Sequence, residues 1–112
     1  MTLQEREAHA CAIIDSMAEE LRDVSLYLHD NPELGLNEHK AVKVINQFLE
    51  NHNFTSQVGL TDLPELQTAL RGDYNGTAQH KIAFLGEYDA LPELGHGCGH
   101  NLIAMMSLGA AV

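Results

Sequence analysis

The stretch KIAFLGEYDALPELGHGCGHNLIAMMSLGAAV, residues 81–112, decides the predicted fold. The apolar run from Lys81 to Tyr88 is typical of a strand, and the uncharged run from Leu102 to Val112 is typical of a helix. Between them lies the loop His96-Gly97-Cys98-Gly99-His100. Open α/β sheets bind ligands where a strand is followed by a glycine-rich loop and a helix. The sequence therefore predicts an α/β fold with a site in this loop.

The loop carries two side chains that bind metals of borderline softness, Cys98 and His100. Residues two apart in an extended or looped backbone point the same way, so both can face one ion. The intervening glycines remove side-chain bulk and permit unusual backbone conformations. A thiolate with an imidazole suits zinc first, with cobalt, manganese or nickel as alternatives. A complete site needs three or four ligands, so others must come from elsewhere.

Two helices are predicted upstream of the loop. The first is one amphipathic helix from Leu3 to about His29, with Cys11 as a buried and inert thiol. Pro32 disfavours helix at the residue before it, and a turn over residues 31–35 follows. The second helix runs from Glu38 to about Asn51. Its predicted N-cap is Asn37, and its predicted left-handed stop is Asn53.

Three strands are predicted between this helix and the loop. The first two cover Phe54 to Leu60 and Leu66 to Asp73, with a loop at residues 61–64 between them. The turn signal Asn75-Gly76 joins the second strand to the third, His80 to Tyr88. The third strand is apolar without alternation, as expected for a strand covered on both faces. The sequence therefore predicts layers of helix over sheet.

Composition excludes several classes of partner. The net charge of −10, from 6 basic and 16 acidic residues, argues against nucleic-acid binding, which depends on Lys and Arg. The only two cysteines, Cys11 and Cys98, do not form a disulfide framework, which favours a reduced, cytoplasmic compartment. We expect no secretory signal, because charged residues occupy the first positions, and no membrane span, because the last apolar run is too short.

The end of the chain indicates a longer protein. The helix from Leu102 to Val112 is apolar on every side and has no stop signal, as expected for a helix inside a larger structure. Three strands and one uncapped helix do not complete an α/β domain. We therefore expect residues 1–112 to be the N-terminal portion of a catalytic domain. Alone, this portion should expose apolar surface, aggregate or partly unfold, and be inactive.

Two motifs together resemble the metal-dependent amidohydrolases of the metallopeptidase family numbered twenty. They are Glu87-Tyr88-Asp89-Ala90-Leu91-Pro92 and Gly95-His96-Gly97-Cys98-Gly99-His100-Asn101-Leu102, and the run from His29 to Gly35 is similar to the family's upstream signature. This family includes aminoacylases, dipeptidases and hydrolases of N-acyl amino acids. The sequence His100-Asn101-Leu102 is closest to the aminobenzoyl-glutamate hydrolase and dipeptidase-like branch.

The resemblance implies a three-layer zinc-peptidase-like catalytic domain and a homodimer formed through an inserted domain that is absent here. It implies that Cys98 and His100 bind metal in a site for two divalent ions and that Asp89 is a supporting carboxylate. Glu87 and His96 are weaker candidates. The catalytic glutamate and the remaining ligands are expected beyond Val112. The implied reaction is hydrolysis of amide bonds in N-acyl amino acids or dipeptides.

Two other functions fit the residues. The same loop could hold a structural ion in a non-catalytic metal-binding or interaction module, with His80 or His29 completing the ligands. Cys98 could instead be the nucleophile of a thiol-based enzyme, because a cysteine near a helix N-terminus has a lowered pKa. Chelation separates these functions, since a thiol enzyme survives the loss of metal.

Overall fold

A computed structural model describes residues 1–60 and 62–112. The elements, in chain order, are α1 (Leu3–Ser16), α2 (Ala18–Asp30), α3 (His39–Asn51), β1 (Thr55–Val58), β2 (Leu70–Asp73), the short 3-10 turn η1 (His96–Cys98) and α4 (His100–Ala111). The loop predicted at residues 61–64 lies partly outside the described residues.

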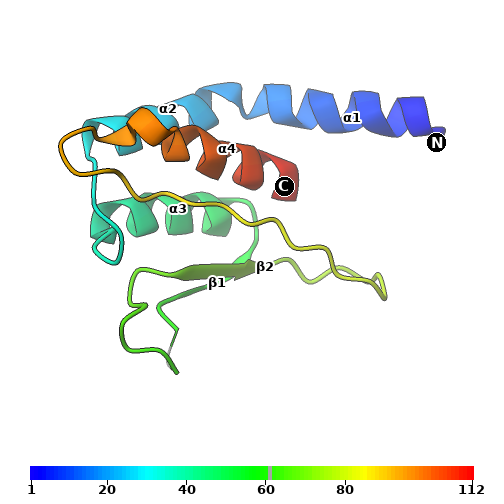
Figure 1. Cartoon of the computed structure of the whole chain (residues 1–112). Helices are drawn as coiled ribbons and strands as arrows, with labels where there is room; N and C mark the ends of the chain where they lie inside the picture. Colours follow the sequence, from blue (N-terminus) through cyan, green and yellow to red (C-terminus); the bar gives the residue numbers. More distant parts are fainter. Residues whose placement is uncertain (61) are drawn as a thin grey trace.

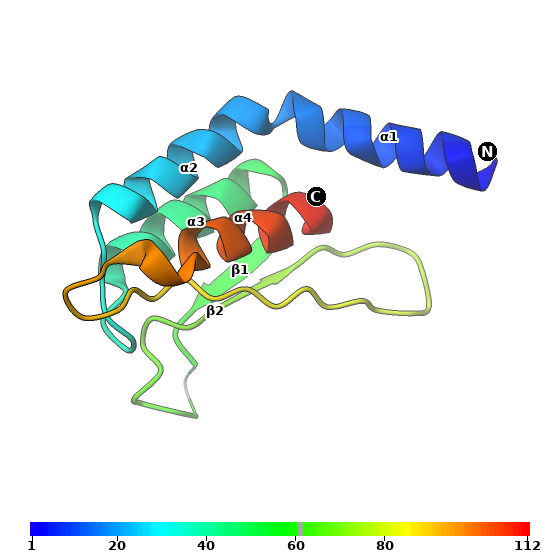
Figure 2. The ribbon, with the colours of Figure 1, turned by 45° about the horizontal axis from the view of Figure 1, so that its top comes forward.

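The helix α3 lies between the sheet and the other helices (Figures 1 and 2). The strands β1 and β2 form an antiparallel pair with Thr55 opposite Asp73 and Val58 opposite Leu70. On the other side of α3, α2 and α4 pack against each other. Apolar side chains from α2, α3 and α4 meet in one core, whose most enclosed members are Leu28 and Phe48. This packing holds the start of α4, and therefore the loop before it, against α2.

The single N-terminal helix predicted from Leu3 to His29 is wrong, because the structure breaks it at Met17 into α1 and α2. The Ser16 hydroxyl donates to the carbonyl of Ile13 at 2.6 Å, and such local bonds compete with the helical ladder. Met17 itself is buried in the core. The bend points Met17 inward and directs α1 away from the body of the molecule (Figure 1).

The predicted burial of Cys11 is also wrong. Cys11 lies exposed on α1, a helix with no buried residue. Its first turn is held by a reciprocal capping box in which Thr2 and Glu5 bond each other's backbone. An apolar stripe on a helix is buried only if another element covers it. Within the described residues, none does so around Cys11.

The third predicted strand, His80 to Tyr88, does not pair with β2. The turn at Asn75-Gly76 is not a hairpin turn: the amide of Gly76 donates to the carbonyl of Tyr74, and the chain then leaves the sheet. A strand requires hydrogen bonds to a neighbour, whereas this segment contacts α4, where the hydroxyl of Ser107 donates to the carbonyl of Leu85. The described residues thus form a mixed α/β structure with a two-stranded sheet, and they do not show three layers.

The cap of α3 differs from the prediction. Its first backbone amides, Lys40 and Ala41, donate to the carboxylate of Glu33 at 2.8 Å, and Asn37 makes no such bond. A carboxylate carries a full negative charge to the positive helix end, which an asparagine amide cannot do. Asn53 has a φ of 66°, so the predicted left-handed stop after α3 is confirmed.

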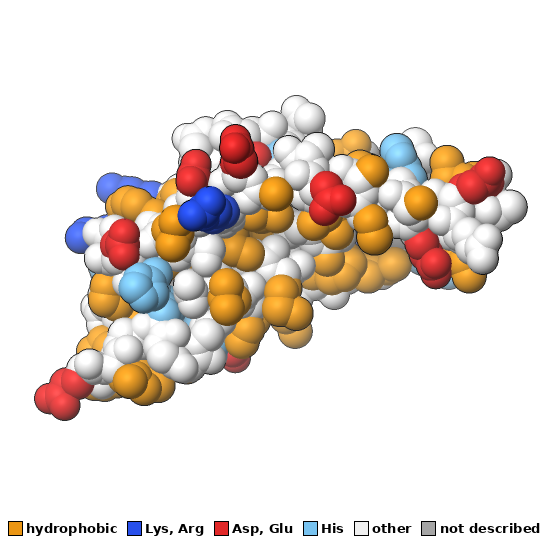
Figure 3. Space-filling model, turned by 90° about the horizontal axis from the view of Figure 1, so that it is seen from above, with side chains coloured by type: hydrophobic (Ala, Val, Ile, Leu, Met, Phe, Trp, Pro, Cys, Tyr) orange, Lys and Arg blue, Asp and Glu red, His pale blue; other side chains and the backbone are white. Residues whose placement is uncertain are grey.

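The last helix begins at His100, two residues earlier than predicted. Ala104, Met105 and Leu108 face the core, whereas Leu102 and Met106 are exposed. Apolar side chains are spread over the surface seen in Figure 3. None of the helices within the described residues is both long and apolar enough to cross a bilayer.

Candidate metal centre

The loop before α4 is shaped by two tight turns. Backbone hydrogen bonds in both directions between Leu91 and Gly95, of 2.9 and 3.0 Å, close the first turn. The second is η1, which the amide of Gly99 closes by donating to the carbonyl of His96. Gly99 adopts a φ of 83°, a left-handed conformation that other residues adopt only at a cost. The glycine between Cys98 and His100 therefore reverses the chain so that α4 starts at His100.

The segment opposite the loop is held by the turn after α2. The amide of Ala90 donates to the carbonyl of Glu33 at 2.7 Å, and Leu34 and Ala90 form an isolated parallel bridge. Two residues before Ala90, the hydroxyl of Tyr88 donates to the carbonyl of Thr68. These bonds fix the backbone on both sides of Asp89. The upstream signature from His29 to Gly35 thus supports the backbone that carries Asp89.

Asp89 and His100 contact each other directly. The Nδ1 atom of His100 lies 2.8 Å from Oδ1 of Asp89 and 3.1 Å from the Asp89 carbonyl oxygen. Since a carboxylate and a carbonyl can only accept, Nδ1 carries the proton. In a neutral imidazole the Nε2 atom then bears the lone pair that binds metals.

The Nε2 atom of His100 faces a second carboxylate. It lies 3.0 Å from Oε2 of Glu87, whose side chain is largely exposed. A neutral imidazole with its proton on Nδ1 has no hydrogen to offer there. The contact therefore requires either a second proton on His100 or a cation shared by the two groups.

The sulfur of Cys98 lies on the same side of Asp89. Its Sγ atom is 3.9 Å from the Asp89 carbonyl oxygen, and the residue is half-buried. The structure thus gathers Cys98, His100 and Asp89, the three residues singled out in the sequence. The hydrogen-bond partner of the sulfur in the described residues is this carbonyl and not a histidine nitrogen, which does not favour a thiol nucleophile.

Glu87 was only a weak candidate from the sequence, yet it contacts His100. The sequence signal that could have identified Glu87 is the alternation of side chains along an extended segment, because residues 87 and 89 project to the same side of such a chain. Tyr88 then projects to the other side and is held by the bond to Thr68. The same alternation explains how one segment presents two carboxylates to one imidazole.

No hydrogen bond or ion pair joins the side chain of His96 to this cluster within the described residues. Its side chain is buried, and its Nδ1 atom has no hydrogen-bond partner among the described residues. Burial lowers the pKa of His96, with smaller contributions in the same direction from His100 and His29. A buried imidazole at the start of η1 is suited to packing the loop against α2.

Tyr88 belongs to a polar network beneath the cluster. The hydroxyl of Thr68 donates to the carboxylate of Glu38, and the carbonyl of Thr68 accepts from Tyr88. Burial, and then the nearby charge of Glu38, raise the pKa of Tyr88 to about 12. The phenol is therefore a neutral donor that ties the carboxylate-bearing segment to the loop before β2.

The donor atoms of Cys98, His100, Asp89 and Glu87 are of the kinds that bind divalent ions. Within residues 1–60 and 62–112, however, no three or more His, Cys, Asp or Glu side chains are arranged to hold an ion. A thiolate, an imidazole and carboxylates are zinc ligands. The Nε2 atom of His100 and Oε2 of Glu87 lie 3.0 Å apart, and these two atoms would be the ones available to an ion at this point. The bond from Nδ1 to Asp89 matches the carboxylate–histidine–metal arrangement that orients such ligands.

Several known hydrolases are similar to this chain in sequence. Xaa-Arg dipeptidase of Mus musculus is 38% identical over 105 residues, which cover 88% of this chain and 24% of the relative. Xaa-Arg dipeptidase of Homo sapiens is 35% identical over 108 residues, with 88% and 25% covered. One of the subunits of p-aminobenzoyl-glutamate hydrolase from Escherichia coli (strain K12) is 28% identical over 116 residues, with 88% and 23% covered. No family model matches the chain.

The fold and the cluster of Cys98, His100 and Asp89 thus occur in a chain whose relatives include two Xaa-Arg dipeptidases and a subunit of p-aminobenzoyl-glutamate hydrolase. The chain belongs to the metallopeptidase family numbered twenty, as its two motifs indicated. It spans about a quarter of the length of the curated relatives it matches.

Proposed function

We propose that Cys98 and His100 are ligands in the metal centre of an amide hydrolase and that Asp89 orients His100. The observation that best supports this proposal is the contact of His100 with two carboxylates. Its Nδ1 atom lies 2.8 Å from Asp89, and its Nε2 atom lies 3.0 Å from Glu87. A divalent cation held by Nε2 of His100 would remove the mismatch of a lone pair that faces the carboxylate of Glu87. This gives Glu87 a place beside the metal as well.

The proposed cofactor is a pair of divalent ions, zinc first, with manganese, cobalt or nickel as alternatives. Such ions polarise the amide carbonyl and lower the pKa of a bound water. The residues of this chain hold and orient them: Cys98 as a thiolate, His100 through Nε2, and Asp89 through its bond to Nδ1. The base and the remaining ligands would come from other parts of the complete protein, which we propose to be a homodimer.

The proposed substrates are dipeptides or N-acyl amino acids. The relatives are named as an Xaa-Arg dipeptidase and an aminobenzoyl-glutamate hydrolase, and both names describe an amide bond to an amino acid. This chain covers about a quarter of them, so we expect the 112-residue chain alone to be inactive.

The test compares the two cysteines of the chain in the complete protein. Cys98→Ala removes the proposed ligand, and Cys11→Ala is the matched control, because Cys11 lies exposed on α1. We expect Cys98→Ala to lose most bound metal, measured by mass spectrometry, and nearly all hydrolysis of a dipeptide panel that includes arginine at the second position. Cys11→Ala should retain both.

A structural ion or a thiol enzyme would give different results. A structural ion predicts that Cys98→Ala lowers metal content but that the metal-loaded wild type hydrolyses none of the substrates. A thiol enzyme predicts loss of activity in Cys98→Ala and full activity of the wild type after chelation. Normal metal content in Cys98→Ala would exclude Cys98 as a ligand.

A further inference from the structure

The residue after His100 is an asparagine that α4 buries against α2. Asn101 is 9% exposed and lies on the face of α4 that also buries Ala104, Met105 and Leu108. A polar side chain on such a face costs stability unless it is hydrogen-bonded, and an apolar residue there would pack without that cost. Asn101 is therefore a polar group that the stability of the core does not require.

Asn101 makes its hydrogen bonds to one residue of α2, Ser25. Its Nδ2 atom lies 3.2 Å from the Ser25 hydroxyl oxygen and 3.4 Å from the Ser25 carbonyl oxygen. Because a carbonyl can only accept, the amide nitrogen of Asn101 is the atom that faces α2. Ser25 is itself 8% exposed and lies inside α2. The pair is a buried polar link between α2 and the first turn of α4.

The remaining contacts between the two helices are apolar. The buried core side chains of α2 and α4 are Val24, Leu28, Ala104, Met105 and Leu108. Apolar attraction is non-directional and tolerates a small slip of one helix along another. A hydrogen bond weakens steeply with distance and angle, so one buried polar pair can fix the register of packed helices. The pair of Asn101 and Ser25 thus sets where the first turn of α4 lies along α2.

The position of His100 depends on this register. His100 is the first residue of α4, and the Gly99 before it adopts a φ of 83° and gives the helix no side-chain cap. The bond from Nδ1 of His100 to Oδ1 of Asp89 is 2.8 Å long. A slip of α4 by about 1 Å would take these two atoms out of hydrogen-bonding range. The first turn of α4 therefore has to be held in place for His100 to keep its orientation.

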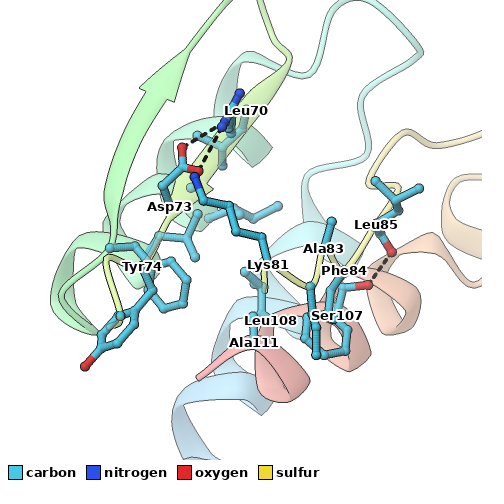
Figure 4. Close-up of a pocket in the computed structure, with 18 of the residues that line it drawn as sticks. Leu70, Asp73, Tyr74, Lys81, Ala83, Phe84, Leu85, Ser107, Leu108 and Ala111 are labelled. Atoms are coloured by element: carbon cyan, nitrogen blue, oxygen red, sulfur yellow. Dashed lines mark hydrogen bonds and ion pairs between the residues drawn. The ribbon is translucent and has the colours of Figure 1, made fainter. Parts of the chain in front are cut away.

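A second polar side chain of α4 holds the later part of the helix. The hydroxyl of Ser107 donates to the carbonyl of Leu85, in the segment that leads to Glu87 and Asp89 (Figure 4). This bond lies toward the other end of α4 and is partly open to solvent, whereas Asn101 is buried beside His100. Asn101 is therefore the contact that acts at the site itself.

We propose that Asn101 is a positioning residue of the metal centre. Through Ser25 it fixes the register of α4 on α2 and so holds His100 against Asp89. This inference rests on the proposed function, because it gives Asn101 a role toward the ion that Cys98 and His100 would hold. Both members of the pair are buried by this chain itself.

The test replaces Asn101 by an apolar residue of similar shape in the complete protein. Asn101→Leu should lower the affinity for zinc about tenfold or more, as measured by competition with a chelator. The urea midpoint of the metal-free protein should be unchanged or raised, because apolar groups replace a buried polar contact at little cost. Asn46→Leu is the matched control and should leave the affinity unchanged. Asn46 is half-buried on α3 and bonds Glu50 of its own helix at 3.1 Å.

A double-mutant cycle with Ser25 shows whether the pair acts as a unit. Ser25→Ala alone should weaken zinc binding by about threefold, since the carbonyl of Ser25 still accepts from Asn101. In the Asn101→Leu background it should cause no further loss. If Asn101→Leu does not fold, the threefold loss in Ser25→Ala still tests the pair.

Three results would overturn the positioning role while the wild type binds zinc. They are wild-type affinity in Asn101→Leu or in Ser25→Ala, additive losses in the double variant, and a loss of affinity matched by an equal loss of stability. A wild-type protein that binds no zinc would instead overturn the proposed function, and this inference with it. The two failures are therefore distinguishable.

Discussion

The Nδ1 atom of His100 and the Oδ1 atom of Asp89 lie 2.8 Å apart, joining the first residue of α4 to the segment before the loop. This bond fixes which nitrogen of His100 carries the proton. It therefore decides that Nε2, on the side of Glu87, is the atom available to a metal. The proposed site depends on this pair as much as on Cys98.

Asp89→Asn should weaken metal binding without unfolding the chain. The amide retains the shape of the carboxylate but removes its charge, and its NH2 group can donate to Nδ1 of His100, which permits the wrong tautomer. We expect the affinity of the complete protein for zinc to fall about 10- to 100-fold, as measured by competition with a chelator. Asp15→Asn on α1 is the control and should have no effect. Unchanged affinity in Asp89→Asn would show that Asp89 does not orient a ligand.

Zinc should protect Cys98 from alkylation and leave Cys11 reactive. Cys11 is exposed on α1, whereas Cys98 is half-buried beside the Asp89 carbonyl. With iodoacetamide, Cys11 should be modified first in either condition, and adding zinc to the complete protein should slow only Cys98, because a coordinated thiolate is not free to react. Peptide mass spectrometry measures both rates. Equal rates at Cys98 with and without zinc would contradict its assignment as a ligand.

Glu33→Gln should destabilise the chain by about 1–2 kcal/mol. The substitution removes the charge that accepts hydrogen bonds from the first amides of α3, at Lys40 and Ala41. Urea unfolding of the complete protein measures the change, and Glu65→Gln in the exposed loop is the control. A loss of stability no larger than that of the control would mean that the cap contributes nothing.

The protein should lose stability in strong alkali because Tyr88 then ionises. Its pKa is raised from 10.0 to about 12 in the folded state, so the folded state favours the neutral phenol. The resulting stabilisation is fully present below pH 10 and is lost as the pH rises toward 12, with a magnitude of roughly 1–2 kcal/mol.

The measurement for Tyr88 is the free energy of unfolding of the complete protein as a function of pH. Tyr88→Phe should be less stable at neutral pH, because the bond to Thr68 is lost, and should lack the decline attributable to this group above pH 10. Tyr74→Phe is the control, since Tyr74 is exposed. If the stability of Tyr88→Phe declined above pH 10 by the same amount as that of the wild type, the decline would be due to other groups.

The sequence by itself determined several local elements and singled out the residues of the candidate site. The residues 38–51 predict α3 to within one residue, Asn53 predicts its left-handed end, and the two glycines between His96 and His100 predict the tight loop before α4. These features arise from contacts a few residues apart, so local patterns are sufficient for them. The spacing of Cys98, His100 and Asp89 likewise brings them together across one short loop.

Only the tertiary structure decided the features that depend on partners distant in sequence. The amphipathic stripe could not show that the chain bends at Met17 and leaves Cys11 uncovered, because burial depends on what packs there. The apolar run from His80 to Tyr88 predicts a strand, yet a strand exists only with a neighbour, and β2 pairs with β1 instead. The carboxylate that caps α3, that of Glu33, was placed by contacts between separate segments, which no local pattern encodes.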